Sequence, residues 1–114
     1  MKTVIYHTPR CSKSRQALAL LQERGAEPEV LDYLKTPPTK AELKALLAKL
    51  GLKPEQVLRT GEAVYKQKFR GRDLTDEQWL EALAENPILL ERPIVVRGSR
   101  AVVGRPPEKV LEIL

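Results

Sequence analysis

The side chain best suited to covalent chemistry in this chain is its single cysteine, Cys11, because a thiolate is a strong nucleophile. It stands in the segment Tyr6-His7-Thr8-Pro9-Arg10-Cys11-Ser12-Lys13-Ser14-Arg15. A helix is predicted to begin directly after it, and helix N-termini and nearby cations both stabilise a thiolate. The spacing therefore predicts a nucleophile beside an anion site. The alternative, an inert cysteine packed like a small apolar residue, is disfavoured by the polar neighbours on both sides.

Two polar side chains close to Cys11 in the sequence could tune its sulfur. His7 is the only histidine and ends a predicted strand. It could pair with the thiolate as an imidazolium, orient it as a neutral donor, or have a purely structural role. Ser14 could donate a hydrogen bond to the sulfur or simply cap the helix. Because Ser14 stands where a second cysteine would make a CxxC pair, any redox cycle must take its electrons from an external thiol.

Cations are placed where an oxyanion could bind. Lys13 and Arg15 fall in the first turn of the predicted helix, where cations cost roughly a few tenths of a kcal/mol each unless an anion or thiolate shares the site. Three further arginines stand beside predicted breaks in structure, and these are Arg59, Arg92 and Arg105. The planar fork of arginine suits tetrahedral oxyanions and keeps its charge. Each of these cations, taken singly, could also be an ordinary surface residue.

Composition excludes several classes of protein. The 114 residues, 42% hydrophobic and 31% charged, are typical of a soluble globular chain, and we expect a single domain over residues 1–114. One cysteine and one histidine cannot supply the usual ligands of zinc or an iron–sulfur cluster, so we expect no metal. We see no apolar run that would span a membrane and no signal peptide, and a lone cysteine suits the reducing cytoplasm. The net charge is +5, but the lysines and arginines mostly alternate with acidic residues, and few aromatic residues are present to stack on bases. Both features disfavour nucleic-acid binding.

Periodicity and turn signals predict the elements that must position these residues. We expect a strand at 3–7, a helix at 12–24 and a parallel strand at 30–33. Capping boxes at Thr39 and Thr75 predict helices beginning there, with shorter helices at 54–58 and 62–68 between them. A hairpin of 93–96 and 101–103 turns at Gly98-Ser99, and Pro106-Pro107 opens a last helix carrying Val110, Leu111 and Leu114. This order predicts an α/β, thioredoxin-like fold, with a mixed four-stranded sheet and a helical insertion between strands 2 and 3.

The chain resembles the arsenate reductase family of thioredoxin-like fold, of the glutaredoxin-dependent type, and within it the compact branch. The resemblance covers nearly the whole chain. Beside the cysteine segment, it is carried by Tyr33-Leu34-Lys35-Thr36-Pro37-Pro38, Leu58-Arg59, Asn86-Pro87-Ile88-Leu89-Leu90-Glu91-Arg92-Pro93-Ile94-Val95-Val96 and Gly104-Arg105-Pro106-Pro107-Glu108.

The resemblance implies an enzyme of arsenic detoxification. The family's nucleophile matches Cys11, its activating histidine matches His7, and its cis-proline matches Pro93. The family's anion-binding arginines match Arg59, Arg92 and Arg105. Arsenate would be reduced to arsenite through a Cys11–arsenic adduct that glutathione and glutaredoxin resolve, with glutathione as co-substrate and no bound cofactor. We expect a monomer, the default for this fold.

Two other functions are compatible with the same resemblance. A related monothiol redox enzyme would act on glutathione mixed disulfides. A second branch of the family consists of regulators that bind RNA polymerase, and its best-known members use a CxxC switch. Ser14 in place of the second cysteine, together with the three candidate arginines, favours the enzyme.

Overall fold

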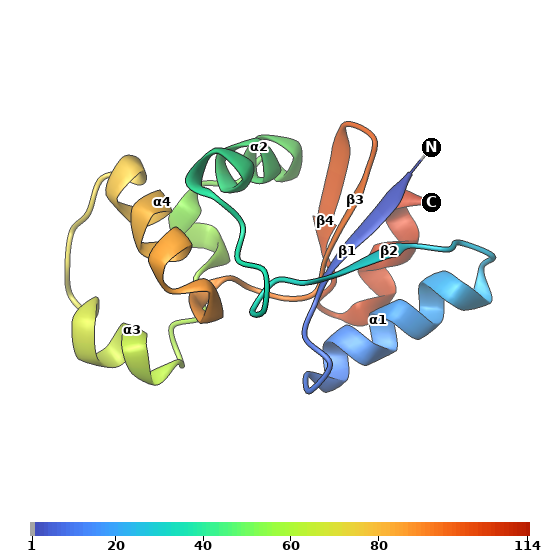
Figure 1. Cartoon of the computed structure of the whole chain (residues 1–114), viewed down its shortest axis with the longest axis horizontal. Helices are drawn as coiled ribbons and strands as arrows, with labels where there is room; N and C mark the ends of the chain where they lie inside the picture. The colour runs from blue at the N-terminus through green and yellow to red at the C-terminus, as the bar shows by residue number, and fades with distance from the viewer. Residues whose placement is uncertain (1) are drawn as a thin grey trace. The chain divides into compact units, whose positions relative to one another are not determined.

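Four strands form one mixed sheet in the order β2-β1-β3-β4, in a computed structural model that describes residues 2–114 (Figure 1). The strands are β1 (Thr3–His7), β2 (Glu29–Asp32), β3 (Ile94–Arg97) and β4 (Arg100–Val103). β1 pairs in parallel with β2 and antiparallel with β3, and β3 pairs antiparallel with β4. The parallel pair is joined by α1 (Ser12–Glu23), as expected for a crossover connection. The predicted mixed four-stranded sheet is confirmed.

The chain divides into two compact units, Met1–Thr36 with Arg92–Leu114, and Pro37–Glu91. The first unit contains the sheet, α1 and a terminal 3-10 helix, η3 (Pro107–Ile113). The second unit is the helical insertion between β2 and β3, which is also confirmed. The single domain over residues 1–114 stays a prediction.

Side chains from α1, the sheet and η3 form the core of the first unit. Ile5 of β1, Val95 of β3 and Ala17 of α1 are each fully buried, and Val110 of η3 packs with them. Residues of β1 alternate between buried and half-buried, the period-2 pattern of a strand covered mainly on one face. This core fixes the start of α1 against the end of β1, where Cys11 lies.

The last helix, predicted to open at Pro106-Pro107, is present as η3. It is a 3-10 helix, with three residues per turn, so positions three apart share one face. Its buried residues are accordingly Pro107, Val110 and Ile113, whereas Leu111 is half-buried and Leu114 exposed. The predicted helix is thus present and carries Val110 and Leu111, but it ends at Ile113, one residue before Leu114.

Two X-Pro peptide bonds of the first unit are cis, Arg92-Pro93 and Arg105-Pro106. The first was a candidate from the sequence, and the second was not foreseen. Gly104 approaches Pro93 closely, because its N–H donates to the Pro93 oxygen at 2.8 Å. A Cβ at position 104 would lie 2.8 Å from Pro93 Cγ and 2.9 Å from Val110 Cγ1, which leaves room only for glycine.

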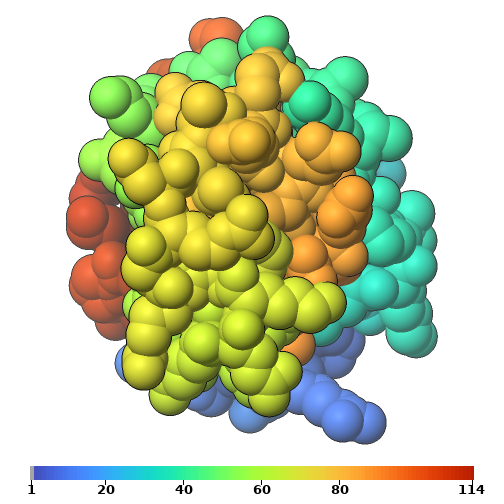
Figure 2. Space-filling view, turned by 90° about the vertical axis from the view of Figure 1, so that its left-hand side faces the viewer, coloured from blue at the N-terminus to red at the C-terminus, as the bar shows by residue number. Residues whose placement is uncertain are grey.

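The second unit contains α2 (Lys40–Leu50), η1 (Pro54–Val57), α3 (Ala63–Lys68), α4 (Asp76–Glu85) and η2 (Pro87–Leu89). Both predicted capping boxes are present, at Thr39 and Thr75. Figure 2 shows the face of this unit formed by α3, the yellow loop that follows it, and α4 in orange. Phe69 and Trp79 pack together in this region, with ring centroids 5.7 Å apart. Among residues 2–114, no helix is long and apolar enough to cross a membrane.

Candidate active site

Cys11 is the N-cap residue of α1, so its sulfur stands at the positive end of the helix dipole. Its backbone is extended, and its N–H donates to the carbonyl oxygen of Thr8 at 3.0 Å. Its carbonyl oxygen accepts the N–H of Arg15 as the helix begins. The thiol is free and half-buried. The loop after β1 therefore presents a partly accessible sulfur to the first turn of α1, as the sequence predicts.

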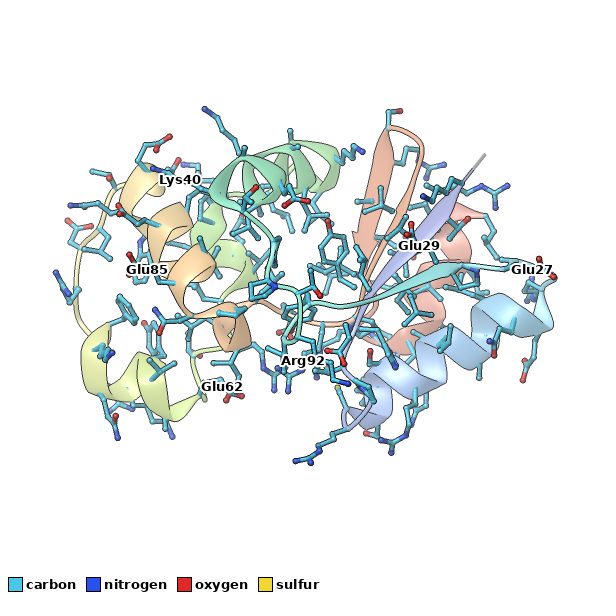
Figure 3. The ribbon with its side chains drawn as sticks, viewed as in Figure 1. Glu27, Glu29, Lys40, Glu62, Glu85 and Arg92 are labelled. Atoms are coloured by element: carbon cyan, nitrogen blue, oxygen red, sulfur yellow. The ribbon has the colours of Figure 1, made fainter. Side chains whose placement is uncertain are left out.

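Two guanidinium groups from the hairpin lie against this sulfur. Nη2 of Arg105 is 3.8 Å from Sγ of Cys11, and the guanidinium of Arg92 also donates a hydrogen bond to it. Because Ile94 pairs with Val103, the residues just outside this pair leave the hairpin at the same end. The antiparallel register thus brings two arginines, distant in sequence from Cys11, to one sulfur. Figure 3 labels Arg92 among the side chains of the structure.

The pKa of the Cys11 thiol is lowered by the sum of these contacts. Burial by itself raises this pKa. A hydrogen bond from the backbone N–H of Ser14, the hydrogen bond and charge of Arg92, and the charge of Arg105 outweigh burial and bring the pKa below its ordinary value. The site therefore favours the nucleophilic thiolate.

His7 lies next to Ser14, the residue whose backbone bonds the sulfur. Its Nδ1 is 2.6 Å from the Ser14 hydroxyl, which also accepts the N–H of Thr8 at 3.2 Å. Burial lowers the pKa of His7, although Asp32 acts in the opposite direction, and Arg15 lowers it further. These effects favour the neutral imidazole over the imidazolium at neutral pH. Ser14, fully buried, bonds the sulfur through its backbone, while its hydroxyl serves His7 and Thr8.

The remaining predicted site residues lie in different surroundings. Arg15 is exposed, and its Nη1 donates to the carbonyl oxygen of Pro9 at 2.9 Å, which braces the loop before Cys11. Arg59 belongs to the second unit, where it pairs with Glu91 at 2.8 Å and with Glu62 at 3.3 Å. Its assignment as an anion ligand stays a prediction.

Tyr33 is a site residue that the sequence reasoning missed. It directly follows β2, its side chain is 1% exposed, and it is hydrogen-bonded to the guanidinium of Arg92. The signal was present in the sequence, because a tyrosine at the carboxyl end of a parallel strand lies near the loop that ends the neighbouring strand β1. Within residues 2–114, no cluster of three or more His, Cys, Asp or Glu side chains could hold a metal ion.

A family comparison identifies the class of protein that this fold and site define. The family model described as "ArsC family" matches residues 6–113, and the chain belongs to this family. The fold is the thioredoxin-like fold of its solved members, as the sequence resemblance implies.

Individual relatives cover the chain almost completely. It is 49% identical over 112 residues to the uncharacterized protein YfgD of Escherichia coli, a match that spans 96% of this chain and 94% of the relative. It is 43% identical to an arsenate reductase of Haemophilus influenzae over the whole length of both chains. A solved structure of an arsenate reductase from Vibrio cholerae is 50% identical, with a TM-score of 0.96 over all of this chain and 98% of the other.

Proposed function

We propose that this chain is an arsenate reductase whose nucleophile is Cys11. The observation that carries the proposal is the contact of the Cys11 sulfur, at the start of α1, with the guanidinium groups of both Arg92 and Arg105. A sulfur in this setting is both activated as a thiolate and surrounded by the charges that an oxyanion needs. The names of the Haemophilus and Vibrio relatives support arsenate as that oxyanion.

The electrostatic problem of the reaction explains why two arginines are needed. Arsenate is an anion at neutral pH, and a thiolate approaching it meets a repulsion of about 4 kcal/mol per charge pair at about 4 Å and an effective dielectric constant of about 20. The fixed charges of Arg92 and Arg105 offset this repulsion before the substrate arrives. Such preorganised charges also stabilise the negative charge of the transition state. Arg59 is the third arginine that we expect to bind the substrate.

The reaction balances as the transfer of two electrons from two thiols to arsenic. The Cys11 thiolate attacks arsenic(V), an S–As bond forms, and one As–O bond breaks, its oxygen leaving as water after protonation. Glutathione then displaces a second oxygen of the adduct as water and forms a second As–S bond. The glutaredoxin thiolate attacks the glutathione sulfur, the bond between that sulfur and arsenic breaks with its electron pair left on arsenic, which becomes arsenic(III), and glutaredoxin leaves as a mixed disulfide with glutathione. Water finally cleaves the bond between Cys11 and arsenic, which releases arsenite and restores the thiol. Overall, one arsenate and two thiols give one arsenite, one disulfide and one water. No bound cofactor takes part in this scheme, and glutathione is the co-substrate.

The chain's own residues account for the dependence on external thiols. Cys11 is the only cysteine, and the position of a CxxC partner is occupied by Ser14. Because Ser14 is fully buried and bonded to His7, it has a supporting role in the site. We assign the same supporting role to His7, which holds Ser14, and to Pro93, which sets the start of β3. The protein would act as a monomer in the cytoplasm, where glutathione and glutaredoxin are available.

A coupled assay tests the proposal. Purified protein is combined with glutathione, glutaredoxin, glutathione reductase and NADPH, with and without arsenate, and wild type is compared with Cys11→Ser. We expect NADPH consumption that depends on arsenate and disappears in Cys11→Ser. Turnover that needs no arsenate but consumes a glutathione mixed disulfide would overturn the arsenate assignment. Arsenate turnover that persists in Cys11→Ser would overturn the nucleophile.

A further inference from the structure

Tyr33 is a buried titratable residue that the proposed reaction does not use. Its side chain is 1% exposed, and its ring packs on that of Tyr6, with centroids 6.4 Å apart and a tilt of 47°. A buried phenol normally requires a hydrogen-bond partner for its hydroxyl group. For Tyr33 a partner is the guanidinium of Arg92, which can only donate, so the phenol oxygen accepts.

Arg92 therefore makes two hydrogen bonds with its guanidinium, to two different groups of the site. One goes to the phenol oxygen of Tyr33 and the other to Sγ of Cys11. The guanidinium is a rigid plane with its five N–H groups in fixed directions, so a bond on one side restricts where the others point. Burial lowers the pKa of Arg92, but the bonds to Tyr33 and Cys11 outweigh it and raise that pKa, which keeps the group charged.

We propose that Tyr33 is a positioning residue, whose phenol oxygen holds the Arg92 guanidinium in the orientation that reaches the Cys11 sulfur. The inference rests on the proposed function only where it concerns turnover. The part concerning the thiol stands on the contacts of Tyr33, Arg92 and Cys11 alone.

The hydroxyl group distinguishes this role from a packing role. Phenylalanine has the same ring and would keep the contact with Tyr6, so packing alone does not require the oxygen at position 33. The hydroxyl group also adds a polar atom to a buried position, which is costly unless it is bonded. Its bond to an arginine that also contacts the sulfur gives the oxygen a specific use.

Tyr33→Phe tests the proposal, with Tyr65→Phe of α3 as the matched control that removes a hydroxyl group from the second unit. The readout is the rate of Cys11 alkylation by iodoacetamide as a function of pH, with thermal unfolding measured in parallel. We expect the midpoint of the Tyr33→Phe profile to move to higher pH, with alkylation at pH 7 slower by about two- to tenfold, the equilibrium worth of one hydrogen bond. Tyr65→Phe should match wild type. An unchanged midpoint in folded Tyr33→Phe would overturn the proposal.

A double-mutant cycle assigns the effect to Arg92. In an Arg92→Gln background, Tyr33→Phe should shift the midpoint no further, because the group that it orients is gone. An additional shift of the same size would show that Tyr33 acts by another route. Arg92→Lys keeps the positive charge but loses the planar guanidinium, and it should also raise the midpoint of the alkylation profile. An unchanged midpoint in Arg92→Lys would overturn the proposal even if Tyr33→Phe does not fold.

The alkylation readout separates this inference from the arsenate assignment. If the protein does not reduce arsenate but Tyr33→Phe raises the midpoint, the proposed function fails and the positioning role stands. If arsenate is reduced and the midpoint does not move, the positioning role alone fails. With arsenate as substrate, we expect kcat/KM of Tyr33→Phe to fall by the same two- to tenfold at pH 7.

Discussion

Arg105 donates a hydrogen bond from Nε to the main-chain oxygen of Arg92, at 2.8 Å, while its Nη2 lies 3.8 Å from the Cys11 sulfur. The accepting carbonyl belongs to the cis peptide bond that precedes Pro93. Since that peptide leads directly into β3, the sheet itself holds the guanidinium of Arg105. Arg92 thus contributes to the site twice, through its side chain to the sulfur and through its backbone to the second arginine.

Replacing Arg92 by alanine should lower turnover far more than replacing an arginine elsewhere on the hairpin. Arg92→Ala removes a charge and a hydrogen bond at the sulfur, and we expect kcat/KM for arsenate to fall by about 10²- to 10³-fold. Arg97→Ala at the end of β3 and Arg100→Ala at the start of β4 are the matched controls. Steady-state kinetics of the three variants check this prediction. Equal losses in all three would contradict the oxyanion site.

The Cys11 thiolate should make the folded state more stable as the pH rises. Its pKa is lower when folded than when unfolded, so the unfolded chain binds more protons between the two values. The contribution is complete above the unfolded pKa and is lost as the pH falls through the folded pKa. Urea unfolding of wild type and Cys11→Ser across this window should show a stability difference that grows with pH. A difference that is constant with pH would refute the lowered pKa.

His7→Ala should raise the pKa of the Cys11 thiol although His7 acts through Ser14. Without the imidazole, the Ser14 hydroxyl loses its 2.6 Å partner, and the Ser14 N–H is held less firmly toward the sulfur. Iodoacetamide alkylation against pH measures the shift, and we expect a smaller one than for Arg92→Ala. His7→Gln, which can still bond Ser14, should restore part of it. An alkylation profile identical to wild type in His7→Ala would leave His7 a purely structural residue.

Gly104→Ala should destabilise the fold, because the new Cβ would lie 2.8 Å from Pro93 Cγ and 2.9 Å from Val110 Cγ1. We expect a loss of about 1–3 kcal/mol in the free energy of unfolding, typical of an overpacked site. Gly61→Ala is the control, since nothing lies within 4 Å of a Cβ there. It should be neutral or stabilise by up to about 1 kcal/mol. Denaturant titrations measure the free energy of unfolding of both variants. A Gly104→Ala variant as stable as wild type would show that the side chains of Pro93 and Val110 can shift at no cost.

Local signals account for what could be predicted from the sequence. The capping boxes at Thr39 and Thr75 define helix starts because both partners lie three residues apart. The turn at Gly98-Ser99 defines the hairpin, since Gly98 adopts a positive φ of 63°. Cys11 could be placed at a helix start for the same reason, because its neighbours in sequence determine its position.

Contacts between distant segments could not be predicted in this way. The bond between Tyr33 and Arg92 depends on how β2 and β3 flank β1, which the pairing of strands decides. The backbone of Ser14 bonds the sulfur, while its hydroxyl group bonds His7. Both contacts depend on how the loop after β1 folds back. The sequence predicts the last helix but not its type, because a segment of seven residues can take three or 3.6 residues per turn.

The order in which the chain is synthesised gives the distance between Cys11 and Arg105 a further meaning. The two residues are 94 positions apart, and the sulfur leaves the ribosome long before the arginine that lowers its pKa. Until the hairpin has been made and has paired with β1, the thiol lacks the hydrogen bond and charge of Arg92 and the charge of Arg105, which lower its pKa. The two arginines thus add their share of the thiol's activation only once the last part of the chain has joined the sheet.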